Sequence, residues 1–194
     1  MQQQIILFDL GGVLVDLADP VTSIGLTMSD EEFWTTWLSS PLVQQFETGR
    51  LTASEFVTQF GPKLGFCDAD EFDRALRSWH LPLFAGAEQA LQNLTDSNTI
   101  ALLSNTNEIH WQHVESQTDV FAEFAKLFLS YETGNAKPHP SAFHDVVAHF
   151  DCEPQDIIFF DDNVGNVAAA RAEGLRAVRV QGWSEVEREI DKIS

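Results

Sequence analysis

Five short apolar runs recur along the chain, separated by stretches long enough to hold helices. They cover residues 5–8, 100–103, 126–130, 157–160 and 176–180. Short continuous apolar runs are typical of strands that are buried on both faces of a parallel sheet. Three of the runs stop abruptly at polar side chains, namely Asp9, Ser104 and the pair Asp161–Asp162.

Helical patterns separate several of these runs. They cover residues 85–94, 139–150 and 164–174; the second opens with a proline in its first turn and the third ends in a glycine. Proline near the start and glycine at the end are typical helix boundaries. Alternating strands and helices predict an α/β fold with a Rossmann-like, doubly wound parallel sheet. Such sheets bind ligands at the carboxyl ends of their strands, where the polar side chains named above fall.

Residues 17–82 carry a different pattern, in which helix-start signals recur and no strand pattern intervenes. The signals are Ser29-x-x-Glu32, Thr52-x-x-Glu55 and Asp68-x-x-Glu71. Each has the spacing of a capping box and precedes an amphipathic run rich in Phe and Trp, which we interpret as the core of the segment itself. Pro41 is expected to split the first helix. The sequence thus predicts a small helical cap at residues 17–82, inserted into a core formed by residues 1–16 and 83–194.

Composition narrows the class of protein. The chain has 194 residues, is 44% hydrophobic and carries a formal charge of −19. It has no apolar run of 18 residues and no basic leader at its start, so neither a membrane span nor a signal peptide is expected. The charge argues against nucleic acid or an anionic membrane as a partner. Cys67 and Cys152 have no metal-type spacing, which favours free thiols and a cytoplasmic protein.

Three carboxylates would meet at the predicted sheet edge, from Asp9, Asp161 and Asp162. Like charges this close repel one another by several kcal/mol unless a cation joins them, and Mg²⁺ prefers carboxylates together with substrate phosphate. Ser104 and Lys137 could then donate hydrogen bonds to phosphate oxygens. In addition, Gly11 and Gly12 would let backbone N–H groups approach an anion. This combination favours phosphoryl transfer with a carboxylate nucleophile.

Four ordered segments, ILFDLGGVLVD, LLSNTN, GNAKPHPSAF and IIFFDDNVGN, resemble the motifs of the haloacid dehalogenase-like (HAD) hydrolase superfamily. The resemblance covers nearly the whole chain and extends to small helical-cap sugar-phosphate phosphatases of the glucose-1-phosphate phosphatase type. It implies a phosphomonoesterase that forms an aspartyl-phosphate on its nucleophile. The implied roles are nucleophile for Asp9, phosphate-binding hydroxyl for Ser104, the cation that steadies nucleophile and phosphate for Lys137, and Mg²⁺ ligands for Asp9, Asp161, Asp162 and the Gly11 carbonyl. Asn105 is a further candidate, which either contacts phosphate or shapes the loop.

Gly11 departs from the family pattern. Most phosphatases of the superfamily have a second aspartate there, which protonates the leaving alcohol and then activates water. General acid–base help is worth about 10²- to 10⁴-fold in rate, so its loss should slow the enzyme without abolishing activity. Two residues are candidates to replace it. Asp16 lies at the entrance to the predicted cap, and His110 has a suitable ordinary pKa.

The sequence leaves competing functions open. Gly11 motivates a non-catalytic module that binds a phosphorylated ligand or a protein. A 2-haloacid dehalogenase would use the same nucleophile, but the extra carboxylates would repel its anionic substrate unless Mg²⁺ neutralised them. A phosphonate-cleaving relative would need a cap lysine for a Schiff base, and the cap has only Lys63. The identity of the phosphate ester and the oligomeric state are not determined by the sequence.

Overall fold

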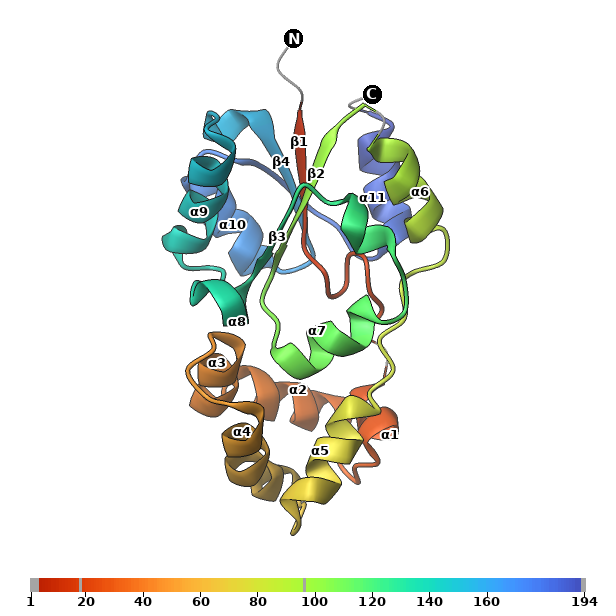
Figure 1. Ribbon diagram of the computed structural model, residues 1–194, viewed down its shortest axis with the longest axis vertical. Helices are drawn as coiled ribbons and strands as arrows, with labels where there is room; N and C mark the ends of the chain where they lie inside the picture. The colour runs from red at the N-terminus through yellow and green to blue at the C-terminus, as the bar shows by residue number, and fades with distance from the viewer. Residues whose placement is uncertain (1–3, 18, 96, 193–194) are drawn as a thin grey trace.

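A five-stranded, all-parallel sheet forms the centre of the computed structural model, which describes residues 4–17, 19–95 and 97–192 (Figure 1). The strand order is β3-β2-β1-β4-β5. The strands are β1 (Ile5–Phe8), β2 (Thr99–Ser104), β3 (Lys126–Leu129), β4 (Ile157–Asp161) and β5 (Arg176–Arg179). The predicted doubly wound α/β fold is confirmed, and each predicted strand forms within one residue of its expected bounds.

The sheet is buried on both faces, which explains why its strands are continuous apolar runs. Ile6 and Phe8 pack into one apolar cluster, and their neighbours Ile5 and Leu7 pack into a second on the opposite face. The helices α6 (Ala87–Leu94) and α11 (Trp183–Ile190) cover the first face, and α9 (Pro140–Phe150) and α10 (Val164–Ala172) cover the second (Figure 1). The sequence patterns had not indicated α11.

Five α-helices form between β1 and α6, and the structure describes no strand among them. They are α1 (Pro20–Ile24), α2 (Asp30–Leu38), α3 (Pro41–Glu47), α4 (Ala53–Phe60) and α5 (Ala69–Arg77), with a 3₁₀ turn, η1 (Gly61–Leu64), after α4. We call α1–α5 the helical group; it lies together beyond the carboxyl ends of the strands (Figure 1). Where the boundary between core and cap falls along the chain stays a prediction.

Local signals explain where these helices begin. Ser29 and Thr52 each form the expected capping box at the starts of α2 and α4. Asp68 caps α5 differently, because its carboxylate accepts the backbone N–H of Asp70 and no box with Glu71 forms. Pro41 begins α3 and separates it from α2, as predicted.

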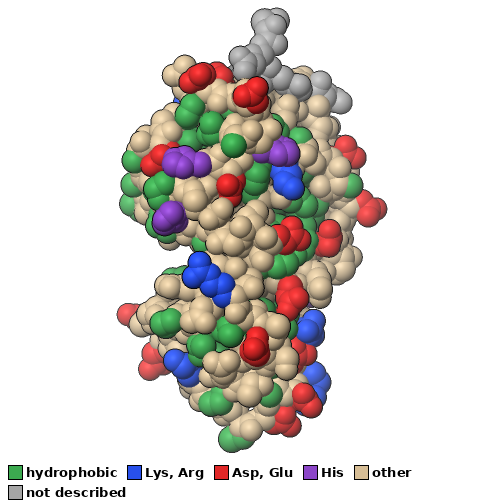
Figure 2. Space-filling model, turned by 60° about the vertical axis from the view of Figure 1, so that its left-hand side comes forward, with side chains coloured by type: hydrophobic (Ala, Val, Ile, Leu, Met, Phe, Trp, Pro, Cys, Tyr) green, Lys and Arg blue, Asp and Glu red, His purple; other side chains and the backbone are tan. Residues whose placement is uncertain are grey.

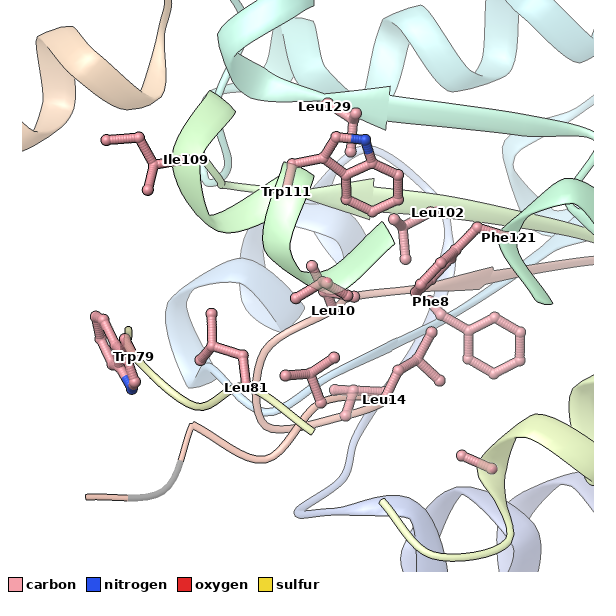
Figure 3. Packing of buried hydrophobic residues seen from close by; sticks show 14 of the residues in the cluster. Phe8, Leu10, Leu14, Trp79, Leu81, Leu102, Ile109, Trp111, Phe121 and Leu129 are labelled. Carbon is pink, nitrogen blue, oxygen red and sulfur yellow. The ribbon is translucent and has the colours of Figure 1, made fainter. Parts of the chain in front are cut away.

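The interior of the helical group is aromatic. Its fully or nearly fully buried rings are Phe33, Trp37, Phe46, Phe56, Phe60, Phe72 and Trp79. The rings of Phe46 and Phe56 stack with their centroids 4.3 Å apart. Figure 3 shows the same apolar cluster continuing toward the sheet, with Leu81 between Trp79 and Leu14 in this view. Apolar burial of this kind contributes about 1.5–3 kcal/mol for each large side chain.

Two connecting segments join the helical group to the sheet, and they run side by side. The Asp16 N–H donates to the Pro82 carbonyl at 2.9 Å, and the Phe84 N–H donates to the Leu14 carbonyl at 2.9 Å. Val15 and Leu83 form an antiparallel bridge between them. Figure 2 shows a waist between the two parts of the molecule.

Further contacts cross from the helical group to short helices of the core, α7 (Glu108–Glu115) and α8 (Ser130–Thr133). The Ala53 N–H donates to the Glu108 carboxylate at 3.1 Å. Gly49, just after α3, has a φ of +66°, and a side chain at this position would overlap the Tyr131 carbonyl oxygen. The end of α3 is therefore held directly against α8.

Replacing Gly49 by alanine should lower the free energy of unfolding by more than the cost of the left-handed backbone conformation alone. A left-handed residue that carries a Cβ costs about 1–2 kcal/mol, and here the Cβ also overlaps a carbonyl. Gly25→Ala is the matched control, since Gly25 has a φ of +77° and a Cβ added there would meet open space within 4 Å. Urea denaturation of both variants measures the difference. If Gly49→Ala and Gly25→Ala lose the same free energy of unfolding, the contact with α8 does not hold α3 in place.

Two remaining observations concern the class of protein. Cys67 is exposed, Cys152 is half-buried, and both are free, as predicted. Within the described ranges, no helix is both long enough and apolar enough to cross a lipid bilayer.

Candidate active site

The three central strands deliver polar side chains to one point. Asp9 directly follows β1, Ser104 is the last residue of β2, and Asp161 is the last residue of β4. In the sheet register Phe8 lies beside Leu102 on one side and beside Phe160 on the other, so Asp9 is level with Asp161 and Ser104 lies one residue further along its strand. The Asp9 N–H donates to the Phe160 carbonyl at 2.8 Å, which holds the Asp9 backbone against β4.

A cluster of carboxylates forms there. Asp9, Asp161 and Asp162 each offer an oxygen within 4.8 Å of the others. The Lys137 ammonium lies between two of them, 2.8 Å from Asp9 Oδ1 and 2.7 Å from Asp161 Oδ2, with its side chain only 1% exposed. Three carboxylates and one ammonium leave two negative charges unbalanced, which is the deficit that a divalent cation would fill.

The pKa shifts of the charged groups in the cluster agree with this deficit of positive charge. Burial, reinforced by the charges of Asp161 and Asp162, raises the pKa of Asp9 above its ordinary value although Lys137 opposes the shift. Burial likewise raises the pKa of Asp162, with Asp161 adding to the effect. Burial alone would lower the pKa of Lys137, but Asp9 and Asp161 hold it above its ordinary value. Without a further cation, the cluster resists full ionisation.

Asp161 is already saturated with hydrogen bonds. Its carboxylate accepts the Lys137 ammonium, the Asn163 N–H at 2.8 Å and the Asn166 side-chain amide at 3.1 and 3.2 Å. Asp162 makes no side-chain hydrogen bond to another residue of the described chain, and Oδ2 of Asp9 is equally unengaged. A metal ion would therefore find free oxygens on Asp9 and Asp162, whereas Asp161 orients Lys137 and the loop around it. A role of Asp161 as a metal ligand stays a prediction.

The two glycines after Asp9 differ in what they offer. Gly12, with a φ of +71°, donates its N–H to the Val15 carbonyl at 2.8 Å, so that N–H is not available to an anion as the sequence had suggested. A Cβ at Gly12 would lie 2.6 Å from Asp162 Oδ2, so the glycine makes room for this carboxylate. Neither the N–H nor the carbonyl of Gly11 bonds to another described residue, so both are free for ligands.

Ser104 and Asn105 follow at the end of β2. The Ser104 hydroxyl makes no hydrogen bond within the described part of the chain, and the residue lines a cavity above Asp9. Asn105 lines the same cavity, but its side-chain amide pairs with the backbone of Lys137, donating at 2.7 Å and accepting at 2.8 Å. Asn105 thus positions Lys137, and the expected phosphate contact stays a prediction.

The two candidate proton carriers differ in their position relative to the cavity. Asp16 is not among the residues that line the cavity, and its backbone N–H is bonded to the connecting segment at Pro82. His110 does line the cavity, and its Nδ1 accepts from the Asn107 side-chain amide at 3.1 Å. Burial, with a smaller contribution from His113, lowers the pKa of His110 to about 3, so its imidazole is neutral at physiological pH.

The cavity lies between the strand ends and the helical group and has a volume of about 440 Å³. Its floor holds Asp9, Ser104, Lys137 and Asp162, and its roof includes Trp34, Trp37, Leu38, Glu47 and Trp79. The motifs in the sequence did not single out Glu47. The available signal was its spacing, because Glu47 lies four residues after the buried Val43 and so places an acidic side chain near the buried face of α3.

Comparisons with known proteins agree with this geometry. Residues 3–174 match the sequence profile of haloacid dehalogenase-like hydrolases. The chain is 26% identical to the D-ribitol-5-phosphate phosphatase of Bacteroides thetaiotaomicron, covering 97% of both proteins. It is 28% identical to the drimenol cyclase drtB of Aspergillus calidoustus, of which it spans only 36%. A HAD family enzyme from B. thetaiotaomicron, solved with magnesium and inorganic phosphate, superposes with a TM-score of 0.78 at 27% identity, covering 92% of this chain and 94% of that one.

Proposed function

The chain belongs to the haloacid dehalogenase-like hydrolase family, and we propose that it is a Mg²⁺-dependent phosphatase of small phosphate monoesters. The observation that carries the proposal is the carboxylate cluster around Lys137 at the floor of a covered cavity. The relative that acts on D-ribitol 5-phosphate makes sugar phosphates the first substrate class to test. Free thiols and a small-metabolite substrate support a cytoplasmic enzyme.

Asp9 is the proposed nucleophile. One of its oxygens attacks phosphorus, the bond to the leaving oxygen breaks, and an aspartyl-phosphate forms; water then attacks phosphorus and returns the carboxylate. Lys137, the Ser104 hydroxyl and the Gly11 N–H are placed to donate to the phosphoryl oxygens as charge builds on them. When bound, Mg²⁺ would neutralise phosphoryl charge, and Asp9, Asp162 and the Gly11 carbonyl would hold it.

The helical group is the proposed cap, formed by residues 17–82 on a core of residues 1–16 and 83–194. It closes the cavity with three tryptophans and so excludes water from the phosphoryl group. A cavity of about 440 Å³ fits a small metabolite but not a polymer. The net charge of −19 also argues against nucleic acid as the substrate.

A non-catalytic binding module is the second candidate function, and Gly11 is its only support. A binding module needs neither a reactive carboxylate at Asp9 nor three buried or half-buried carboxylates that repel one another. A haloacid dehalogenase is disfavoured on the same ground, since its anionic substrate would enter a site with two unbalanced negative charges. The intact cluster therefore favours the phosphatase.

Mg²⁺ should stabilise the protein as well as activate it. An ion that binds only the folded state at about 100 times its Kd adds about 2.7 kcal/mol to the free energy of unfolding. We expect MgCl₂ to raise the Tm, EDTA to reverse the rise, and phosphate release from a panel of phosphorylated metabolites to require the ion. Asp162→Asn should remove most of the Tm shift. Phosphate release that is unaffected by EDTA would contradict the proposed metal site.

A further inference from the structure

We propose that Glu47, the last residue of α3, is the proton carrier of this enzyme: it protonates the leaving oxygen and then takes the proton of the attacking water. The inference rests on the proposed phosphatase function. It answers the gap left by Gly11, which can offer backbone groups but cannot transfer a proton. A covered site still needs an acid, because an alkoxide is a poor leaving group where bulk water is excluded.

Elimination among the described residues around the cavity leads to Glu47. The ionisable side chains that line this cavity and the one adjoining it are Asp9, Glu47, Arg50, His110, Lys137 and Asp162. Lys137 is held by two carboxylates, and an arginine does not release its proton. Asp162 faces the proposed metal position, and His110 is neutral. Glu47 alone faces the cavity as an acid without an ionic partner.

The position of Glu47 suits this role. It lies on α3 of the helical group and lines both cavities, whereas Asp9 and Lys137 line the first cavity from the side of the sheet. The leaving group of a phosphate held at Asp9 must point away from the nucleophile for in-line displacement, and thus toward the cap. The close packing of Gly49 against Tyr131 anchors the end of α3 above the site.

The surroundings of Glu47 prepare it to carry a proton. Its side chain is half-buried, and the Trp37 indole N–H donates to Oε1 at 3.4 Å. Burial raises the pKa of Glu47 to about 7, with the Trp37 hydrogen bond opposing the shift. The carboxyl group is thus near half-protonation at neutral pH, where a group can both donate and accept a proton efficiently.

The two half-reactions balance. In the first, Asp9 bonds to phosphorus, the electron pair of the breaking P–O bond goes to the leaving oxygen, and that oxygen takes the proton of Glu47, releasing an alcohol. In the second, the Glu47 carboxylate takes a proton from water as the water oxygen bonds to phosphorus. The electron pair of the Asp9–phosphorus bond returns to the Asp9 carboxylate, and phosphate leaves. Glu47 ends protonated, ready for the next turnover.

The decisive experiment compares two aryl esters of nearly equal shape in the Glu47→Gln variant, which keeps an acceptor for Trp37. The leaving group of phenyl phosphate is phenolate, a basic anion that needs a proton. The leaving group of 4-nitrophenyl phosphate is 4-nitrophenolate, a stable anion that does not. We expect kcat/KM, which reports steps up to aspartyl-phosphate formation, to fall about 10²- to 10⁴-fold for phenyl phosphate and little for 4-nitrophenyl phosphate. Equal losses on the two esters, or no loss on either, would overturn the proposal.

A second readout addresses the hydrolytic step and pH. With 4-nitrophenyl phosphate, the variant should release a burst of nitrophenolate stoichiometric with enzyme, because the aspartyl-phosphate has lost its base and accumulates. In the wild type, kcat/KM for phenyl phosphate should fall as the pH rises through about 7, since the acid must be protonated. That descending limb should be absent in Glu47→Gln. If the variant releases nitrophenolate linearly without a burst, or if its kcat/KM falls with pH as in the wild type, Glu47 contributes only to packing.

Matched variants complete the test. Glu31→Gln makes the same change at an exposed residue of α2 and should leave both esters and the pH profile unaltered. Glu47→Asp keeps the acid and should recover part of the lost rate on phenyl phosphate. If the wild type hydrolyses no phosphate ester at all, the proposed function fails. If the wild type is active and Glu47→Gln is equally active on both esters, only the role of Glu47 fails.

Discussion

The variant Asp9→Asn is expected to lose kcat by a factor on the order of 10⁶, the scale on which other hydrolases respond to removal of a covalent nucleophile. The asparagine side chain cannot form an acyl phosphate, although it can still accept the Leu10 N–H that now bonds to Oδ1 at 2.7 Å. The change also removes one buried negative charge from a cluster that carries too many. The folded state should therefore survive, with Lys137 still paired to Asp161.

Two measurements separate chemistry from folding in this variant. Phosphate release gives the rate, and thermal denaturation without metal gives the stability, which should be equal to or higher than that of the wild type. Asp119→Asn is the control, because Asp119 is exposed and its side chain makes no hydrogen bond within the described chain. A folded Asp9→Asn protein with more than a few per cent of wild-type activity would show that another group attacks phosphorus.

Lys137→Met should produce the largest loss of stability of any single substitution at the site. Lys137 is buried and ion-paired with Asp9 and Asp161, and removing one partner of a buried ion pair costs about 3–5 kcal/mol because the remaining charge is uncompensated. Activity should be lost as well, since no ammonium would remain at the phosphoryl oxygens. Urea denaturation in the absence of metal measures the change in the free energy of unfolding.

The pH dependence of this loss follows from the carboxylates left behind. Without Lys137, which opposes the effect of burial, the folded-state pKa of Asp9 rises further above its unfolded value. The folded state then binds more protons than the unfolded state at mildly acidic pH, and its stability falls as the pH rises. Because burial already raises the pKa of Asp9 to about 8 in the wild type, the deficit of Lys137→Met should grow as the pH rises through about 8, and added Mg²⁺ should reduce it. A loss under about 1 kcal/mol at pH 8 would contradict the ion-pair argument.

Much of this architecture could be predicted from the sequence because it depends on local patterns. Continuous apolar runs identify strands buried on both faces, and parallel pairing then brings their carboxyl ends to one edge without further information. Asp9, Ser104 and Asp161 are consequently predictable neighbours. Ser29 and Thr52 likewise identify helix starts, since a capping box involves only residues three positions apart.

The remaining features depend on contacts that sequence spacing does not encode. Gly12 looks like an anion-binding glycine, but its N–H is used by Val15 and its missing side chain makes room for Asp162. Asn105 directly follows Ser104, but nothing in that position indicates that its side-chain amide pairs with the backbone of Lys137. By contrast, α11 could have been predicted, because its buried residues Trp183, Val186 and Ile190 recur at helical spacing.

The paired connections at Leu14–Phe84 and Asp16–Pro82 have a consequence for how such a protein can diversify. Because the inserted segment leaves and re-enters the sheet at one place, its removal or exchange need not alter the separation of β1 and β2. A lid of different length or composition could be inserted at these paired connections while the side chains at the strand ends keep their spacing. Substrate selectivity can thus change through exchange of the inserted segment, while the sheet beneath it keeps the groups that carry out the reaction.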